Sequence, residues 1–340
     1  MVPRHHLARH LRLSPALRLP RASSCGPAGP RGDVGRAVEY VVAVLSIIGI
    51  HALLGLSVYL VAITGQLSFG QQGFYAIGAY LAGMATALWN WSLGPALALG
   101  TVAAGVVGFL VGFPALRVRG LYLGIATLGF GEIVRLGFLN LKYTKTIGGR
   151  LVGPNGAEGF RHVTYVYERG ITQGQYLLVI LLALALVIVL ISLLERSRLG
   201  VQFRAVEEDE IAAAVAGVHV TAVKVLAFTL GGMVAGLGGA LFVHYSTYID
   251  HEMVALPLAV SAVTYAMLGG LGSCWGTVLG AAVLISLTEG LRVAKEFRLI
   301  VYGALIILVM TLRPRGLVDE RVVLWLGGWM RRRRWRLDAP

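Results

Sequence analysis

Long uninterrupted apolar segments dominate the pattern of the chain. They cover residues 38–63, 72–90, 93–114, 121–141, 174–194, 220–244, 254–272, 275–291 and 299–312. A helix needs about twenty apolar residues to cross a bilayer core that is about 30 Å thick. The pattern therefore predicts an all-α polytopic membrane bundle of about 8–10 transmembrane helices.

The composition fits a membrane protein and excludes an ordinary soluble one. Of the 340 residues 56% are hydrophobic and 14% are charged, whereas soluble proteins carry about 25% charged residues. The two cysteines, Cys25 and Cys274, have no metal-binding spacing. The sequence therefore predicts no metal site and no disulfide framework.

Basic residues gather at both ends of the chain, whose net charge is +13. Seven arginines precede residue 37, and four consecutive arginines begin at Arg331. Such flanks mark the cytoplasmic side of a membrane. We expect a disordered basic tail over residues 1–37, a transmembrane domain over 38–318 and a basic cytoplasmic tail over 319–340. No soluble domain is left to present a nucleic-acid surface.

The distribution of charge between the segments predicts their orientation. With the C-terminus inside, residues 117–119 and 195–218 also fall inside, and residues 89–91 and 250–252 fall outside. The same count places the arginine-rich N-terminus outside, although basic flanks usually lie on the cytoplasmic side. The conflict disappears if residues 38–90 make an odd number of crossings.

The segment Thr64–Gln72 is polar and glycine-bearing, although apolar residues flank it. Non-helical backbone persists at membrane depth only where protein or a watery cavity satisfies it, and broken helices in transporters line the substrate route. We consider two interpretations, a discontinuous membrane segment and an ordinary loop. In the first, Gln66, Ser68, Gln71 and Gln72 supply hydrogen-bonding groups to a path.

Two further features lie within the apolar segments. Glu132 and Arg135 are three residues apart on one helix face, so they can pair; the pair is either structural or faces a path. Small residues recur every four positions, which lets helix backbones approach closely. These packing residues are Gly232, Gly236 and Ala240, and Gly272, Gly276 and Gly280.

The polar segment 195–218 predicts a short helix on the cytoplasmic side. Four acids, Glu207 to Glu210, precede an alanine-rich run that Gly217 ends. Acids suit a first helical turn, alanine favours helix, and glycine suits the end. So short a helix needs a docking partner or the membrane surface. The alternative is an amphipathic linker.

Five segments together resemble the branched-chain amino-acid permease family of ATP-binding-cassette importers, and its LivM-type members most. The segments read GQLSFG and FYAIGAY at 65–80, RGLYLGIATLGFGEI at 119–133, a loop at 200–217 with Lys224, GGLGS at 269–273, and RPRGL at 313–317. The resemblance covers residues 38–318. The loop 146–156 departs from the family pattern, and so do Glu207 and Ala214.

The resemblance implies a permease subunit that translocates branched-chain, hydrophobic amino acids across the bacterial inner membrane. It implies two cytoplasmic ATPase subunits, a second related permease in a heterodimer, and an extracytoplasmic binding protein. The chain has no GxxxxGK[ST] loop, so we expect the partners to bind the ATP. The resemblance assigns ATPase docking to Arg204, Glu207, Glu208, Asp209, Glu210, Ala212, Ala213 and Gly217.

Other functions remain as alternatives. Urea or short amides are a second substrate class within the same resemblance. A membrane-embedded enzyme would need converging catalytic groups, and the segments contain no HExxH, paired-Asp or GxSxG arrangement. We therefore expect no enzyme activity. A passive channel would have no need of the docking helix.

Overall fold

The computed structural model describes residues 30–115, 118, 120–147 and 149–290, together with residues 303 and 311. The predicted C-terminal tail, the RPRGL segment and most of the block 299–312 lie outside these residues, as do residues 1–29. The first helix begins at Pro30, inside the predicted N-terminal tail. Proline is favoured at the first helical position, which accounts for the earlier start.

The described residues form helices and one small sheet. The helices are α1 Pro30–Ala62, α2 Gln71–Ala87, α3 Leu93–Ala115, α4 Leu121–Asn140, α5 Tyr165–Glu168, α6 Gln173–Arg196, α7 Arg198–Glu208, α8 Glu210–Val215, α9 Val220–Ser246, α10 Leu256–Gly269 and α11 Cys274–Gly290. The strands are β1 Lys145–Ile147, β2 Arg150–Pro154 and β3 Phe160–Arg161, with a short 3-10 turn at Gly156–Glu158.

The predicted all-α membrane bundle is confirmed. Each apolar block up to residue 291 corresponds to a helix whose ends differ from the prediction by a few residues, apart from the start of α1. Within the described residues five helices (α1, α3, α4, α6 and α9) are long and apolar enough to cross a membrane, and six spans result if α10 and α11 count as one bent span. The axes of α10 and α11 differ by 119°.

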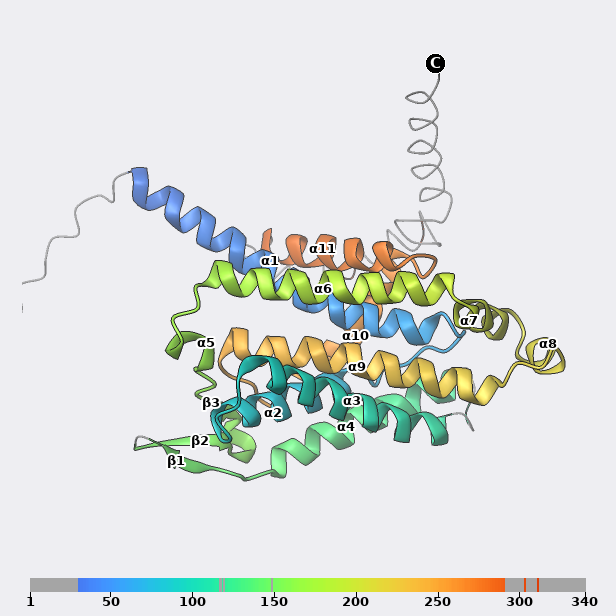
Figure 1. Ribbon diagram of the computed structural model, residues 1–340, viewed down its shortest axis with the longest axis horizontal. Coiled ribbons are helices and arrows are strands. Elements are labelled where there is room, and N and C mark those ends of the chain that lie inside the picture. Colours follow the sequence, from blue (N-terminus) through green and yellow to red (C-terminus); the bar gives the residue numbers. More distant parts are fainter. Residues whose placement is uncertain are drawn as a thin grey trace, which may run out of the picture. The chain divides into compact units, whose positions relative to one another are not determined.

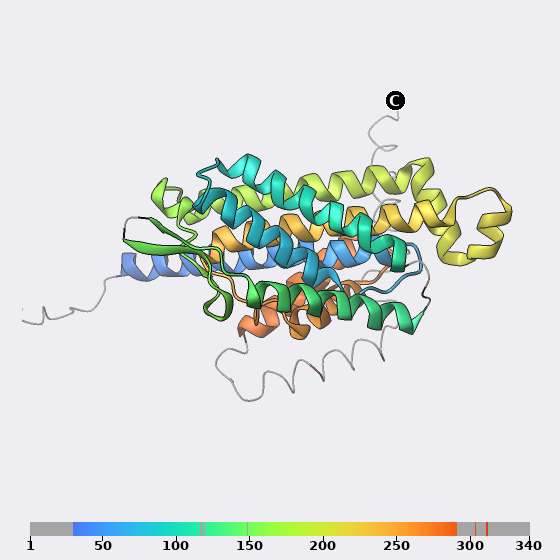
Figure 2. The same cartoon turned by 90° about the horizontal axis from the view of Figure 1, so that it is seen from below.

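Helix α9 packs against α1, α2 and α3 through glycine. Figure 2 shows α9, in yellow and orange, between teal α3 and blue α1. A Cβ atom on Gly239 would lie 1.9 Å from the carbonyl oxygen of Tyr75 in α2, and one on Gly232 would lie 2.9 Å from that of Ala104 in α3. A Cβ on Gly231 would meet the carbonyl oxygen of Ser57 in α1 at 2.9 Å. These helices therefore touch backbone to backbone, as small residues in membrane helices allow.

Three glycines from three helices meet at one point of this interface. A Cβ on Gly78 of α2 would lie 2.1 Å from the carbonyl oxygen of Gly236 in α9. One on Gly100 of α3 would lie 2.6 Å from that of Gly78, and one on Gly236 would lie 3.0 Å from that of Gly100. We call α2, α3 and α9 the glycine-packed unit.

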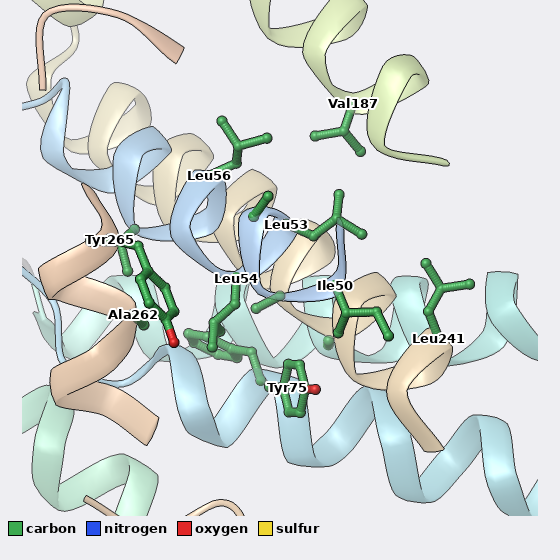
Figure 3. Close-up of a cluster of buried hydrophobic side chains, with 14 of the residues drawn as sticks. Ile50, Leu53, Leu54, Leu56, Tyr75, Val187, Leu241, Ala262 and Tyr265 are labelled. Atoms are coloured by element: carbon green, nitrogen blue, oxygen red, sulfur yellow. The ribbon is translucent and has the colours of Figure 1, made fainter. Parts of the chain in front are cut away.

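The core of the bundle is built on α1. Ile50, Leu53, Leu54 and Leu56 are fully buried, and Figure 3 shows them among side chains of α2, α6, α9 and α10. Residues 50–62 of α1 are mainly apolar, with His51 and Ser57 as exceptions, as expected of a helix that other helices surround.

Helices α10 and α11 form a tight pair. A Cβ on Gly280 would lie 2.3 Å from the carbonyl oxygen of Tyr265, and one on Gly276 would lie 2.5 Å from that of Gly269. Gly272 lies in the turn between the two helices. Two of the three glycines in the predicted row therefore lie at a helix contact, and the third lies outside a helix.

The bundle has two distinct ends. Helices α7 and α8 lie at the right in Figure 1, and β1 to β3 with α5 lie at the left. The sheet has the antiparallel order β1-β2-β3, with Lys145 opposite Val152 and Gly153 opposite Arg161. The backbone N–H of Phe160 donates to Ile249 (2.7 Å), which ties the loop after α9 to the same end.

Residues 41–87 cross the bundle twice. The turn after α1 lies beside Glu207, at the α7 end, while Leu93, after α2, donates its N–H to the Tyr165 hydroxyl at the sheet end (3.2 Å). By length and composition α1 qualifies as a membrane span and the shorter α2 does not, so the number of membrane crossings over residues 38–90 stays a prediction. Of the two interpretations of Thr64–Gln72, the structure fits the ordinary loop, because this segment is a turn that joins two antiparallel helices.

Candidate functional site: a buried polar turn and an exposed helical segment

The turn between α1 and α2, residues 63–70, buries most of its polar side chains, while Gly65 and Leu67 are exposed. The Thr64 hydroxyl donates to the carbonyl oxygen of Val61 (2.8 Å), and the backbone N–H of Phe69 donates to Thr127 Oγ1 of α4 (3.0 Å). The Ser68 hydroxyl accepts from the N–H of Gly70 (3.2 Å). Protein groups thus satisfy part of this non-helical backbone, as its burial requires.

Three glutamines of the turn and of the first turn of α2 are almost completely buried. Gln66 is 5% exposed, and Gln71 and Gln72 are each 1% exposed. Among the described groups, Gln66 Oε1 and both amide atoms of Gln71 and Gln72 have no hydrogen-bond partner. A buried polar group without a partner costs about 1–3 kcal/mol. These buried amides therefore favour contact with water or with a polar ligand.

Glycines on neighbouring helices make room for two of these amides. A Cβ on Gly131 of α4 would lie 2.5 Å from Gln72 Nε2, and one on Gly231 of α9 would lie 3.6 Å from Gln71 Nε2. Gln72 thus lies beside α4 and Gln71 beside α9. All four predicted path residues, Gln66, Ser68, Gln71 and Gln72, lie in the turn or at the start of α2. Their role in transport stays a prediction.

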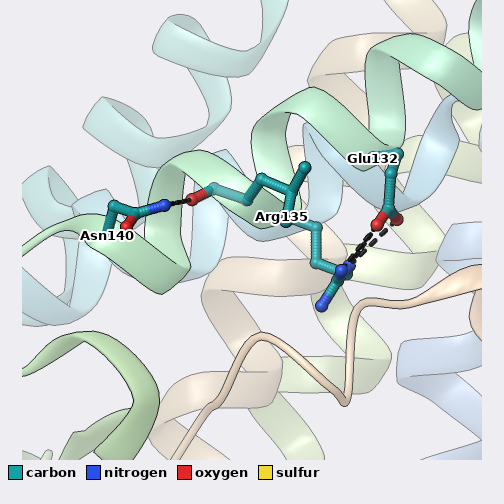
Figure 4. Close-up of polar contacts among 4 residues, drawn as sticks. Glu132, Arg135 and Asn140 are labelled. Atoms are coloured by element: carbon teal, nitrogen blue, oxygen red, sulfur yellow. Dashed lines mark hydrogen bonds and ion pairs between the residues drawn. The ribbon is translucent and has the colours of Figure 1, made fainter.

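Glu132 and Arg135 form the ion pair that their spacing predicts. Arg135 Nε donates to both carboxylate oxygens of Glu132, at 2.8 and 2.9 Å (Figure 4). The Glu132 side chain is 40% exposed and that of Arg135 is 19% exposed. Whereas Gly131 faces the glutamines, Glu132 and Arg135 lie on a more open part of α4. Whether they face a path stays a prediction.

The predicted docking helix over 207–216 is wrong in its bounds: there are two helices, α7 and α8, which meet at Asp209. The backbone of Asp209 is extended (φ −155°, ψ 110°), and its Oδ1 accepts from the N–H groups of Ile211 (2.8 Å) and Ala212 (3.1 Å). An Asp carboxylate readily accepts hydrogen bonds from the first N–H groups of a helix, so Asp209 can cap a new helix. It therefore ends one helix and begins the next.

One side of the α7–α8 segment is exposed. Phe203 and Val206 of α7 and Ala213 of α8 are buried, whereas Ile211 is 70% exposed and Val215 is 85% exposed. Ala213, which was predicted to dock, points into the protein instead. The other predicted docking residues are exposed or half-exposed: Arg204, Glu207, Glu208, Asp209, Glu210, Ala212 and Gly217.

Side-chain contacts tie this end of the bundle together, and the sequence did not reveal them. Lys224 of α9, which is 4% exposed, forms an ion pair with Glu210 of α8. The Tyr59 hydroxyl of α1 donates to Glu195 Oε1 at the end of α6 (2.6 Å). The partners are 14 and 136 residues apart, so no helical periodicity links them.

The opposite end carries a cavity of about 370 Å³ beside the sheet. Asn155, Glu158, Arg161 and His162 are among its lining residues. Arg161 lies over the ring of Tyr248, 5.5 Å from its centre. Burial raises the pKa of the Tyr248 hydroxyl, and so does its hydrogen bond to Asp250 Oδ2 (2.8 Å). The polar groups at this end therefore hold one another in place.

Known proteins match most of the chain. Residues 40–310 match the family described as "Branched-chain amino acid transport system / permease component". The high-affinity branched-chain amino acid transport system permease protein LivM of Salmonella typhimurium is 34% identical over 311 residues, which are 85% of this chain and 70% of the relative. LivM of Escherichia coli has the same identity and coverage.

A sugar transport protein matches less closely. The ribose import permease protein RbsC of Bacillus subtilis is 28% identical over 275 residues, which are 74% of this chain and 81% of RbsC. No solved structure matches the chain significantly.

Proposed function

From the premise that the chain belongs to the branched-chain amino acid transport system permease family, we propose that it translocates branched-chain, hydrophobic amino acids. The relatives are permease components and not enzymes, and the apolar helices make this a multi-pass inner membrane protein. We place the end that holds α7 and α8, and the C-terminus, in the cytoplasm. The basic residues that end the chain support this orientation.

The observation that carries the choice of substrate is the 34% identity to LivM over 85% of this chain. Identity to the ribose permease is lower, at 28% over 74% of the chain. The matched region includes the α7–α8 segment and residues 63–72, which carry Gln66, Gln71 and Gln72 and are called the glutamine turn below. Both the polar turn and the exposed segment therefore lie within the part that is shared with amino-acid permeases.

The proposal places substrate against the glutamine turn. A zwitterionic amino acid needs hydrogen bonds for its charged ends and apolar surface for its side chain. Gln66, Gln71 and Gln72 offer buried donors and acceptors without protein partners, and they border the apolar core. A passing substrate can therefore gain hydrogen bonds there without first breaking others.

Energy for import comes from other chains in this proposal. The sequence lacks a phosphate-binding loop, so two cytoplasmic ATPase subunits bind the ATP, and this chain needs no cofactor of its own. The exposed side of α7 and α8 is the docking surface. A second related permease completes a heterodimeric pore, and an extracytoplasmic binding protein delivers the substrate.

One alternative substrate class has support from the site itself. Urea and short amides form the same hydrogen bonds as a glutamine amide, so the orphaned amides of the turn would also suit them. A passive channel is disfavoured because the exposed apolar residues Ile211 and Val215 favour a cytoplasmic partner.

The proposal is tested by uptake in cells that lack this chain. Labelled leucine, isoleucine and valine uptake should fall and should return when the chain is restored, while urea and acetamide uptake should not change. Loss of urea or amide uptake with normal leucine uptake would select the alternative. Unchanged uptake of all these compounds would overturn the proposal.

A further inference from the structure

Lys224 is a charged side chain in an unusual place, near the start of a central membrane helix. It is 4% exposed, and its ammonium group pairs with Glu210, which is 30% exposed. Lysine is rarely buried so completely unless it is paired. Removing one partner of such a pair leaves a buried charge uncompensated and is strongly unfavourable. The pair therefore holds α8 firmly against α9.

The α8 helix has few other means of attachment. It is six residues long, and its Ile211 and Val215 side chains extend away from the protein. The extended backbone at Asp209 separates it from α7. Ala213 is the buried side chain of α8, and Glu210 is 30% exposed. A displacement of α8 by a bound partner can therefore reach α9 through the Glu210–Lys224 pair.

From Lys224 onward, α9 passes such a movement to α2 and α3 through backbone contacts, which have no flexible side chains between them. Gly236 and Gly239 of α9 touch the backbone of α2, and Gly232 touches that of α3. Packed interiors of this kind shift between discrete arrangements and do not deform gradually. Helix α2 begins with Gln71 and Gln72, so a movement of the unit also moves these buried amides.

We propose that Lys224, through its ion pair with Glu210, is the positioning residue that passes movement of the docking segment to the glycine-packed unit and its buried glutamines. This inference rests on the proposed function, because it assumes that ATPase subunits move α8. It adds that the movement passes from α8 to the membrane helices at Lys224 of α9. Lys224 itself touches neither substrate nor ATP.

The test uses the complete transporter in proteoliposomes, with this chain, both ATPases, the sister permease and the binding protein. The readout is leucine imported per ATP hydrolysed. Lys224→Met and Glu210→Gln should each lower this ratio about tenfold, within the usual range of coupling between sites. Lys224→Arg keeps the pair and should keep the ratio. The double variant Glu210→Lys/Lys224→Glu should recover at least half of it, whereas Glu210→Lys alone should not.

Co-purification of the ATPases and the melting temperature show whether each variant assembles and folds. If Lys224→Met does not accumulate, Glu210→Gln decides the matter, because its side chain is more exposed. A wild-type ratio in Glu210→Gln, or a double variant no better than Glu210→Lys, would overturn the coupling role. A wild-type complex that imports no leucine would instead overturn the proposed function.

Discussion

Single glycines decide how closely the helices of this protein approach. At Gly78, Gly236 and Gly239 an added Cβ would lie between 1.9 and 3.0 Å from a neighbouring carbonyl oxygen, which is closer than a van der Waals contact permits. At Gly137 of α4, by contrast, nothing lies within 4 Å. Two helical glycines can therefore look alike in the sequence and differ completely in what they permit.

Gly239→Ala should destabilise the bundle, because the added methyl group must push α9 away from the Tyr75 backbone. Overpacking of this kind costs about 1–3 kcal/mol. The matched change Gly137→Ala meets no neighbour and should leave stability equal or raise it by about 1 kcal/mol, because alanine favours helix. Thermal unfolding of the detergent-solubilised chain compares the two. Equal melting temperatures would contradict the backbone contact.

At the scale of elements, two short non-helical segments shape the cytoplasmic end in the proposed orientation. Asp209 divides α7 from α8, and the turn at 63–70 separates α1 from α2. The turn touches the last residues of α7 through backbone: Gly65 has φ +73°, and a Cβ there would lie 3.3 Å from the Cα of Glu207. The turn that carries the glutamines therefore lies directly behind the proposed docking segment.

Asp209→Ala should loosen α8, because the helix loses the side chain that caps its first N–H groups. Loss of such a cap costs about 1 kcal/mol. Asp209→Asn keeps an accepting oxygen and should behave like the wild type. Hydrogen exchange of the α8 amides in the full complex measures the effect directly, and faster exchange is expected for the alanine variant alone. Equal protection in both variants would show that the cap is unimportant.

Gly65→Ala should impair transport beyond the cost of its backbone strain. A left-handed backbone costs a non-glycine residue about 1–2 kcal/mol, and at Gly65 the methyl group also presses on Glu207. Gly170, between α5 and α6, has φ +66° and no neighbour within 4 Å, so Gly170→Ala isolates the strain. Leucine uptake per ATP hydrolysed should fall in Gly65→Ala and not in Gly170→Ala. An equal effect of both would mean that the contact with Glu207 is irrelevant.

The long helices could be predicted from the sequence because uninterrupted apolar residues alone specify them. The sheet could not, because β1 and β3 have three and two residues and their partners pair through turns that hydropathy does not reveal. Asp209 was counted among the acids of a first turn, although its side chain can cap just as well. The Glu210–Lys224 and Tyr59–Glu195 contacts arise only when separate helices pack together.

At the scale of the whole molecule, the outer helices retain large uncovered faces. In an 18-residue apolar stretch of each helix, only 22% of α4 and 28% of α6 are buried inside the chain, against 61% of α9. Lipid suits the apolar residues on these faces, but α4 also carries the half-exposed Glu132. A charged group at membrane depth is costly unless protein or water surrounds it. This face of α4 is therefore a natural place for the proposed sister permease.

The most direct test of the account is ATP-driven uptake of labelled leucine into proteoliposomes that hold the ATPases, the sister permease and the binding protein, with and without this chain. We expect uptake that requires both ATP and this chain, and that excess unlabelled isoleucine or valine inhibits while urea and acetamide do not. Leucine uptake of equal rate in vesicles without the chain, or ATP-dependent uptake of urea or acetamide in place of leucine, would contradict it.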